Sequence, residues 1–247
     1  MPTLHLLGTG ASLSTPDRTT TMLAVEGDSV LVIDCGGDVV QRLLAAGIDL
    51  LKIQLLILTH EHPDHVAGFP LFMQKLWLAG RRDAVRVRGP APALDQARRL
   101  YESFDTRRWT GLPGIDWREV PLEENALVWE DDEWRVTASP GKHSVPVVGV
   151  RIDHAVGNGS VTYSADTERV ESIARLARAS DILVHEATGD FPSHTSAGDA
   201  AALARDAGVG RLLLVHLPIG WRDEDIVAAH AVFPDTEAGR DGSRYDF

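Results

Sequence analysis

The sequence predicts an α/β fold, an αββα sandwich in which two mixed β-sheets lie face to face with helices on their outer faces. Strand-like runs gather in two stretches of the chain and helical segments follow each of them, the pattern of sheets covered by helices. The chain also contains no repeat, no low-complexity tract and no linker-like stretch long enough to divide it. We therefore expect residues 1–247 to form a single domain.

In the first part of the chain, the predicted strands are short runs of apolar or β-branched residues that end at glycines or polar residues. They are Thr3–Leu7, Met22–Val25, Val30–Asp34, Leu55–Leu58 and Val85–Arg88. Helices are predicted where apolar residues recur with helical period, and a proline suits the first turn of the second one. They run from Val39 to the residue before Gly47, from Pro70 to about Leu78, and over Pro92–Phe104.

In the rest of the chain, a strand-rich stretch precedes a regular alternation of helices and strands. The strand-rich stretch comprises Asp116–Val120, Glu133–Ala138, Val147–Ile152 and Ser160–Ser164. The alternation that follows comprises helices Val170–Ala177, Ala197–Ala207 and Glu224–Phe233 and strands Ile182–Val184, Leu212–Val215 and one near the C-terminus. The loops at the strand ends are expected to carry the chemistry, because connecting segments on a rigid scaffold hold most functional residues.

The composition is that of an ordinary globular protein, with 44% apolar and 24% charged residues. Cys35 is the one cysteine, so a disulfide framework is excluded. The first residues lack the basic and apolar stretches of a secretion signal, and no apolar run approaches the roughly 18–20 residues needed to cross a bilayer. We expect a cytoplasmic enzyme that has no membrane partner.

The charge is strongly negative overall but uneven along the chain. A net charge of −12 opposes binding to long nucleic acids, because neutralising phosphates supplies most of their non-specific affinity. Residues 75–108 nevertheless hold nine basic side chains against four acids, whereas residues 116–133 hold eight acids against Arg118. The two segments are either solvated faces of helices and turns or, for the basic one, a local rim that attracts phosphate. Composition alone leaves both interpretations open.

The most informative segment is His60–His65, which reads His-Glu-His-Pro-Asp-His and follows the apolar run Leu55–Thr59. Three of the ten histidines of the chain lie in these six positions. Neutral imidazoles and ionised carboxylates are the ligands that bind metals such as Zn²⁺. Crowded together at a strand end, they indicate a metal site rather than a solvated polar turn.

Four further residues of ligand type also follow predicted strands. They are Asp34, His143, Asp166 and His216. Each alone is as consistent with a cap or turn residue as with a metal ligand. Neighbours on a short loop diverge, so the His60–His65 segment cannot close a site alone, and ligands from distant strand ends are expected to complete it.

These motifs resemble those of the metallo-β-lactamase superfamily, and within it the ribonuclease Z-like branch. The signature His-x-His-x-Asp-His is matched at 60–65 and followed by Val-Ala-Gly at 66–68. A Leu-Gly-Thr-Gly segment is matched at 7–10, Asp-Cys-Gly at 34–36 and His-Glu-Ala-Thr at 185–188. The segment 194–196, His-Thr-Ser, is similar to the family's His-Ser-Thr. The agreements cover nearly the whole chain.

The resemblance implies a dinuclear metal-dependent hydrolase with two divalent ions, Zn²⁺ being the best suited and Mn²⁺ or Fe²⁺ the alternatives. It places His60, His62 and His143 on one ion and Asp64, His65 and His216 on the other, with Asp166 between them. It makes Asp34 a group that orients the histidine ligands. It also implies that Asp64 acts as a base, that His194 protonates the leaving group and that Glu186 holds His194.

The chain departs from tRNA-maturing members of the branch at two places, which bears on its substrate. Those proteins carry a long flexible arm between the segments that match His143 and Asp166, where this chain has 22 residues. They also follow the last metal-binding histidine with a Ser-x-Arg-Tyr type of segment, where this chain has Leu217–Arg222. These departures favour a small or cyclic nucleotide-like phosphodiester as the substrate.

Several alternatives remain open at this stage. The first is a ribonuclease Z-type tRNA 3′-processing endonuclease that lacks the arm and binds RNA. The second is a lactonase or another ester or thioester hydrolase, since the same dinuclear site supports that chemistry. A non-catalytic binding protein is disfavoured by the complete ligand set. A homodimer is possible, and Trp77 and Trp221 are candidates for the wall of a substrate pocket.

Overall fold

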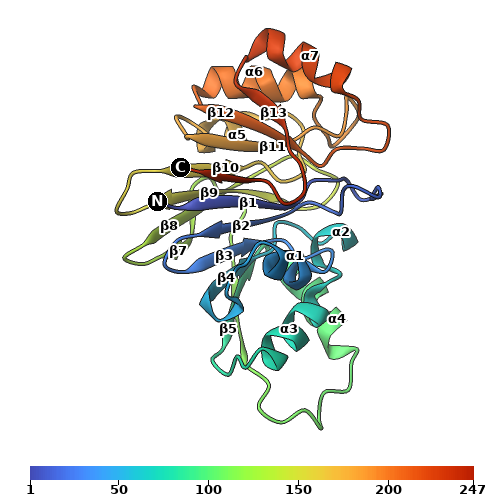
Figure 1. Cartoon of the computed structure of the whole chain (residues 1–247), viewed down its shortest axis with the longest axis vertical. Helices are drawn as coiled ribbons and strands as arrows, with labels where there is room; N and C mark the ends of the chain where they lie inside the picture. Colours follow the sequence, from blue (N-terminus) through green and yellow to red (C-terminus); the bar gives the residue numbers. More distant parts are fainter.

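Two seven-stranded mixed β-sheets lie face to face in a computed structural model that describes residues 1–247, apart from the side chain of Asp223 (Figure 1). The first sheet has the order β14-β1-β2-β3-β4-β5-β6, with bounds Arg244–Asp246, Thr3–Gly8, Met22–Glu26, Val30–Ile33, Ile53–Ile57, Val85–Gly89 and Ile115–Glu119. The second has the order β13-β12-β11-β10-β9-β8-β7, with bounds Thr236–Ala238, Arg211–Val215, Ile182–Glu186, Ser160–Tyr163, Val148–His154, Trp134–Pro140 and Ala126–Glu130. The predicted fold class is confirmed.

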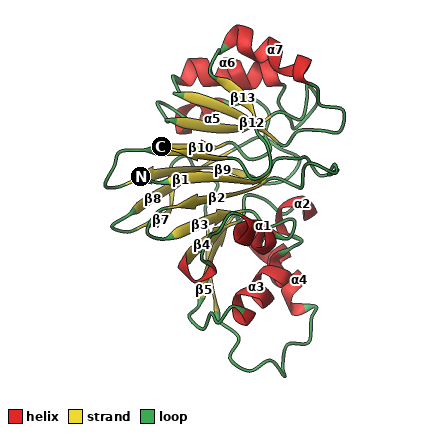
Figure 2. Ribbon diagram, viewed as in Figure 1, coloured by secondary structure: helices red, strands yellow, loops and turns green.

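The two sheets share a hydrophobic core between them, and helices cover the outer face of each sheet (Figure 2). On β3, Leu31 and Ile33 point into the core between the sheets, whereas Val30 and Val32 pack against the outer helices. Both faces of this strand are therefore buried, which explains why its sequence is a continuous apolar run. The helices α1 (Val39–Ala45), α3 (Phe69–Leu78) and α4 (Ala91–Glu102) cover the first sheet, and α5 (Glu171–Leu176), α6 (Ala197–Ala207) and α7 (Asp223–Val232) cover the second.

Each sheet is antiparallel at one side and parallel at the other. Strands β3 to β6 run parallel in the first sheet, and β10 to β13 run parallel in the second. Parallel strands all end at the same end of their sheet. The loops that follow β3, β4, β10, β11 and β12 therefore gather at one end of the sandwich. This arrangement positions the candidate site.

The structure adds elements that the sequence pattern did not predict. Strand β7 lies at the edge of its sheet, and it was not predicted although its sequence contains the apolar run Ala126–Trp129; Leu127 within it is 54% exposed. Two strands, β13 and β14, replace the one expected near the C-terminus, and each has three residues. Two short helices, η1 (Leu50–Lys52) and α2 (Pro63–Val66), are likewise too brief to show a period.

The basic segment 75–108 makes many contacts within the protein, and four of its basic side chains pair with an acid. Eight of its nine basic side chains have a partner: an acid, an amide, an aromatic face or backbone carbonyl groups. Arg81, for example, donates to the carbonyl oxygens of Ile53 and Asp83. These contacts favour the interpretation of the segment as a solvated and self-compensated face.

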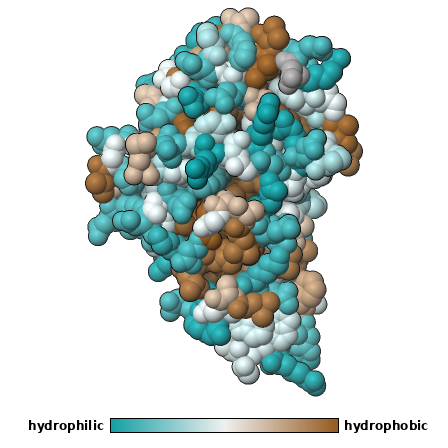
Figure 3. Space-filling model, viewed as in Figure 1, coloured by the Kyte–Doolittle hydropathy of each residue, from teal (hydrophilic) through white to brown (hydrophobic). Residues whose placement is uncertain are grey.

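The surface is mostly hydrophilic, with one apolar area on the face seen in Figure 3, over α1 and η1. Leu44 and Leu51, which belong to these two elements, are 59% and 52% exposed. Among the helices that the structure describes, none is long and apolar enough to cross a membrane.

One half-buried carboxylate links the two sheets at the end opposite the strand-end loops. Asp131, between β7 and β8, accepts hydrogen bonds from Trp129 Nε1 (2.8 Å), from the backbone N–H groups of Glu133 (2.9 Å) and Trp134 (2.7 Å), and from Gln54 Nε2 on β4 (2.7 Å). Partial burial raises the pKa of this carboxyl, but these four donors outweigh burial and hold the pKa below its ordinary value.

We predict that Asp131→Asn lowers the free energy of unfolding at pH 7 by about 2–3 kcal/mol, because an amide cannot satisfy all four donors. Because the pKa of this carboxyl is lower in the folded than in the unfolded protein, its contribution to stability is fully present above the unfolded-state pKa. The contribution is lost as the pH falls through the folded-state pKa. The difference between wild type and variant should therefore shrink below about pH 4. Urea unfolding across pH tests this, with the exposed neighbour Asp132→Asn as control; an equal effect of both substitutions would contradict it.

Candidate metal centre

The candidate ligands lie where the chain turns sharply at the ends of strands. Asp34 follows β3 with φ +61°, Ala165 precedes Asp166 after β10 with φ +53°, and His216 follows β12 with φ +54°. Left-handed backbone at a non-glycine residue costs about 1 kcal/mol or more and persists only where the surroundings enforce it. Three such turns at one end of the sandwich indicate that this edge is shaped for a site.

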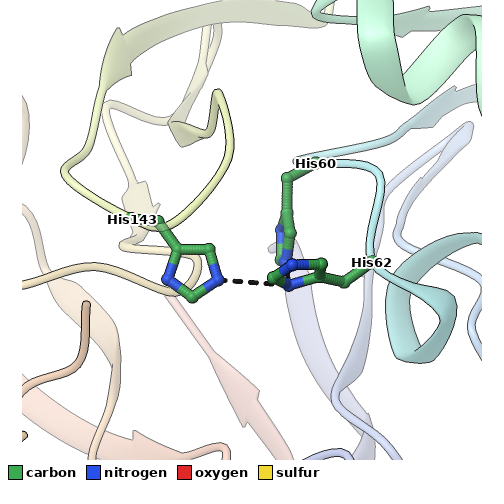
Figure 4. Close-up of side chains that lie close together, drawn as sticks. All are labelled: His60, His62 and His143. Carbon is green, nitrogen blue, oxygen red and sulfur yellow. Dashed lines mark hydrogen bonds between the residues drawn. The ribbon is translucent and has the colours of Figure 1, made fainter. Parts of the chain in front are cut away.

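Three imidazoles converge at the first ion position (Figure 4). His62 Nδ1 lies 3.1 Å from His60 Nε2 and 3.1 Å from His143 Nε2. The other ring nitrogens of His60 and His143 are engaged, because His60 Nδ1 faces Thr59 Oγ1 at 3.1 Å and His143 Nδ1 donates to the carbonyl oxygen of Ser193 at 2.8 Å. The Nε2 lone pairs of His60 and His143 therefore both point at His62 Nδ1. A single proton on that nitrogen cannot form good hydrogen bonds to both.

A second group of ligand atoms adjoins the first. His216 Nε2 lies 3.4 Å from Asp64 Oδ2, and His65 Nε2 lies 3.6 Å from the same oxygen. Asp166 Oδ2 lies 3.2 Å from His216 Nε2, 3.7 Å from His65 Nε2 and 4.0 Å from His60 Nε2. Its carboxylate therefore reaches both groups, as a bridging ligand must.

Two orphaned atoms show that these residues fit metal ions. His65 Nε2 and Asp166 Oδ1 are buried and have no hydrogen-bond partner among the residues that the structure describes. Leaving such atoms unpaired costs about 1–3 kcal/mol each, and a cation bound between these two side chains would satisfy both. The donor set of imidazole nitrogens and two carboxylates suits Zn²⁺ and also accepts Mn²⁺ or Fe²⁺.

The electrostatics of the pocket favour a cation. Burial lowers the pKa of His60 well below its usual value, helped by the charge of His65, and keeps His60 in the neutral form that a ligand needs. Burial also opposes charge on His65, but Asp166 and Asp34 outweigh it and raise the pKa of His65 well above normal. The surroundings thus stabilise positive charge at His65, where a bound cation would take the place of the proton.

Asp34 fixes the orientation of His65. Its fully buried carboxylate accepts hydrogen bonds from Thr59 N (2.8 Å), Thr59 Oγ1 (2.9 Å) and His65 Nδ1 (2.8 Å). The last bond leaves the lone pair of His65 on Nε2, which faces Asp64 and Asp166. In the same group, His216 Nδ1 donates to Thr188 Oγ1 at 2.6 Å with the same effect.

Glycines let the loop after β3 pack directly against the loop that holds the histidines. A Cβ on Gly36 would lie 1.6 Å from the carbonyl oxygen of Asp64, and one on Gly68 would lie 2.1 Å from that of Gly37. No side chain fits at either position. This close approach brings Asp34 within hydrogen-bond distance of His65 and explains the Asp-Cys-Gly motif.

His194 and Glu186 form a separate pair beside the ligand groups. Glu186 is fully buried at the end of β11, and its carboxylate accepts from His194 Nδ1 (3.1 Å) and from the backbone N–H groups of Thr167 (3.2 Å), Thr188 (2.8 Å) and Thr195 (3.0 Å). Burial lowers the pKa of His194, but the bond and charge of Glu186 outweigh it and raise this pKa. A histidine held in this way can donate a proton near neutral pH.

The ring of His194 lies between the two ligand groups. It stacks on His216 with 5.7 Å between centroids and an interplanar angle of 13°, and it meets His143 edge-on at 5.1 Å and 74°. The structure thus brings all seven predicted ligands, with His194 and Glu186, into one pocket. The supporting groups Thr59, Thr188 and Ser193 were not predicted; Thr188 ends the His-Glu-Ala-Thr motif, but the carbonyl of Ser193 carries no sequence signal.

A buried set of imidazoles and carboxylates at one end of an αββα sandwich defines this protein as a metal-dependent hydrolase. Residues 30–217 match the model of the β-lactamase superfamily domain, and the chain belongs to this family. The predicted superfamily is confirmed.

Curated relatives support the ribonuclease Z-like branch. Ribonuclease Z from Methanothermobacter thermautotrophicus is 28% identical over 98% of this chain and 95% of its own length. That alignment has 299 positions against the 247 residues here, so at least 52 positions have no counterpart in this chain.

Solved structures share the fold over the full length of the chain. The metallo-β-lactamase fold protein YhfI from Bacillus subtilis has a TM-score of 0.84 and 20% identity, with complete coverage of both chains. The short form of human tRNase Z has a TM-score of 0.82 and 19% identity over 99% of this chain and 98% of its own. At these identities the likeness concerns the fold alone.

We predict that Asp34→Asn lowers the affinity for the metal about 10–100-fold, because an amide holds His65 less firmly than a carboxylate does. The variant should stay folded, because asparagine tolerates the positive φ at this position. Chelator competition followed by metal analysis measures the effect. Asp95→Asn, an exposed carboxylate on α4, is the matched control. Unchanged metal retention in Asp34→Asn would exclude the orienting role.

Proposed function

We propose that this protein is a ribonuclease Z-type phosphodiesterase that hydrolyses phosphodiester bonds in RNA. The observation that carries the proposal is the His194–Glu186 pair, which stands beside two ligand groups joined by Asp166. Hydrolysis of a phosphodiester needs a site for the anionic phosphoryl group and an acid for the departing oxygen, and this pocket offers both. The ribonuclease Z relative, aligned over nearly the whole chain, supports RNA over the small substrate favoured from the sequence.

The residues of the pocket divide the work. His60, His62 and His143 would hold one ion, Asp64, His65 and His216 the other, with Asp166 shared. Two divalent ions bound there would activate a water for attack and neutralise the phosphoryl charge. Asp64, 11% exposed at the open side of the group, is placed to accept a proton from the attacking water. His194 donates a proton to the leaving oxygen, and Glu186 holds the ring so that Nε2 faces the pocket.

A small phosphodiester is the second candidate substrate, and a specific observation favours it. The stretch between His143 and Asp166 forms β9, a tight turn and β10, with no protruding arm among these residues. The net charge of −12 also works against a long polyanion. An enzyme without an arm would accept a phosphodiester small enough to contact only the metal centre.

Comparing substrates separates the two candidates. We predict that the metal-loaded enzyme cleaves both a precursor tRNA with a 3′ trailer and bis(4-nitrophenyl) phosphate, and that Asp64→Ala lowers kcat on both by about 10³-fold or more because base and ligand are lost together. A higher kcat/KM for precursor tRNA supports the proposal, and the reverse order supports the small diester. Absence of bound metal, unchanged turnover in Asp64→Ala, or activity on lactones alone would refute both.

The role of His194 can be tested through the leaving group. We predict that His194→Ala lowers kcat on RNA about 10²–10⁴-fold, because a sugar alkoxide needs a proton as it departs. Turnover of bis(4-nitrophenyl) phosphate should change far less, since 4-nitrophenolate leaves without one. Glu186→Gln should show the same selectivity in weaker form. Equal losses on both substrates would mean that His194 acts by holding the pocket together.

A further inference from the structure

A cavity of about 490 Å³ opens at the loop after β1 and has no part in the chemistry above. Three segments bound it: residues 15–18 of the loop after β1, residues 218–221 after β12, and residues 240–241 near the C-terminus. Its principal lining residues are Thr15, Asp17, Arg18, Trp221, Arg240 and Asp241. The volume falls within the range of pockets that bind small organic ligands, about 300–1,000 Å³.

The backbone ties this cavity to the metal centre. Pro218, in its wall, stands two residues after the candidate ligand His216. Leu217, between them, donates through its N–H to the carbonyl oxygen of Thr9 (3.0 Å) and accepts from the N–H of Ala11 (3.0 Å). The loop after β1 and the segment after β12 are thereby joined at the end of the sandwich that carries the ligands (Figure 1).

The inner wall of the cavity is rigid and electrically balanced. Asp241 accepts hydrogen bonds from Thr9 Oγ1 (2.8 Å) and from the backbone N–H of Thr19 (2.8 Å), and it lies 3.3 Å from Arg42 Nη2. Arg18 donates to Thr9 Oγ1 at 2.7 Å. Because Asp241 is engaged in this way, its charge is compensated within the wall and does not repel an incoming anion.

Arg240 supplies the charge that faces outward. It is exposed, and among the side chains that the structure describes none forms an ion pair with it. About half of the 21 arginines form an ion pair with a carboxylate among the described residues, as Arg175 does with Glu124. A free guanidinium at the mouth of a cavity is a ready site for a phosphate group, which it can bind through two parallel hydrogen bonds.

Trp221 supplies an aromatic wall. Its indole is half-buried, packs on the core beneath α6 and α7, and lines the cavity. Base stacking on an aromatic side chain contributes about 1–3 kcal/mol per base. Asp17, exposed on the rim, adds an acceptor for a ribose hydroxyl or an amino group of a base. One free guanidinium, one indole and one acceptor match the parts of a nucleotide.

We propose that this cavity binds the nucleotide next to the scissile phosphodiester, with its phosphate on Arg240 and its base on Trp221. The inference rests on the proposed phosphodiesterase function and names the part of the substrate that lies outside the metal centre. The cavity would also let this chain hold RNA without an inserted arm, because contacts with one further nucleotide add to the affinity for the RNA.

Kinetics on two substrates test the assignment. Arg240→Ala and Trp221→Ala should each raise KM for a short RNA about tenfold and leave kcat within twofold, because neither residue touches the reacting atoms. Both variants should hydrolyse bis(4-nitrophenyl) phosphate, which carries no nucleotide, as wild type does. Trp221→Phe should restore most of the loss by keeping an aromatic face. Arg108→Ala, an exposed arginine on the loop between α4 and β6, is the control.

Direct binding separates failure of this inference from failure of the proposed function. Calorimetric titration of the metal-loaded protein with adenosine 5′-monophosphate should show binding that weakens about tenfold in Arg240→Ala and in Trp221→Ala. That result would support the cavity even if no diester is cleaved. Unchanged RNA KM and unchanged nucleotide binding in both variants would overturn the proposal. Inorganic phosphate binding as tightly as the nucleotide, with no effect of Trp221→Ala, would also overturn it.

Discussion

One buried carboxylate holds the metal loop in its working shape. Asp34 accepts three hydrogen bonds, from Thr59 N, Thr59 Oγ1 and His65 Nδ1, and none of its surface is exposed. Thr59 Oγ1, by donating to Asp34, is left to accept from His60 Nδ1, so a single acid fixes the tautomers of two ligands. The glycines at 36 and 68 exist for this contact, since any side chain there would separate the two loops.

The sandwich matters because it brings strand ends from two sheets to one place. The His60–His65 segment follows β4 of the first sheet, whereas Asp166 and His216 follow β10 and β12 of the second. Packing the sheets through a common core fixes the distance between these ends, which a flexible chain could not do without a large entropic cost. The left-handed turns at Asp34, Ala165 and His216 are tolerated because this packing pays for their strain.

The ligand-rich segment could be predicted from sequence because its signal is local. Five residues of ligand type in six positions need no knowledge of the fold, and the strand before them is apolar except for Gln54. Asp34, His143, Asp166 and His216 could be recognised as strand-end residues, but joining them into one site required the family resemblance. The distances between these four residues depend on how the sheets pack, and the spacing of apolar residues along the sequence does not determine that packing.

The unpredicted parts have physical reasons. Ser193 orients His143 through a backbone carbonyl, and every residue has one, so the sequence holds no mark of it. The strands β13 and β14 are too short for an alternation to appear, whereas β7 contains an apolar run that was not assigned to a strand. Arg240 was not predicted because its importance lies in what it lacks, an acidic partner, and pairing is visible only in three dimensions.

The negative charge of the molecule sets the terms on which it can bind an anion. At physiological ionic strength, interactions beyond about 8 Å are largely screened, so the charge of −12 acts mainly on approach and little on contact. Affinity for a phosphodiester must then come from groups that touch it. The metal centre would provide one such contact through ions whose charge outweighs its two carboxylates, Asp64 and Asp166. The proposed subsite at Arg240 and Trp221 would provide a second, and two short-range contacts would favour a nucleotide chain over a simple anion.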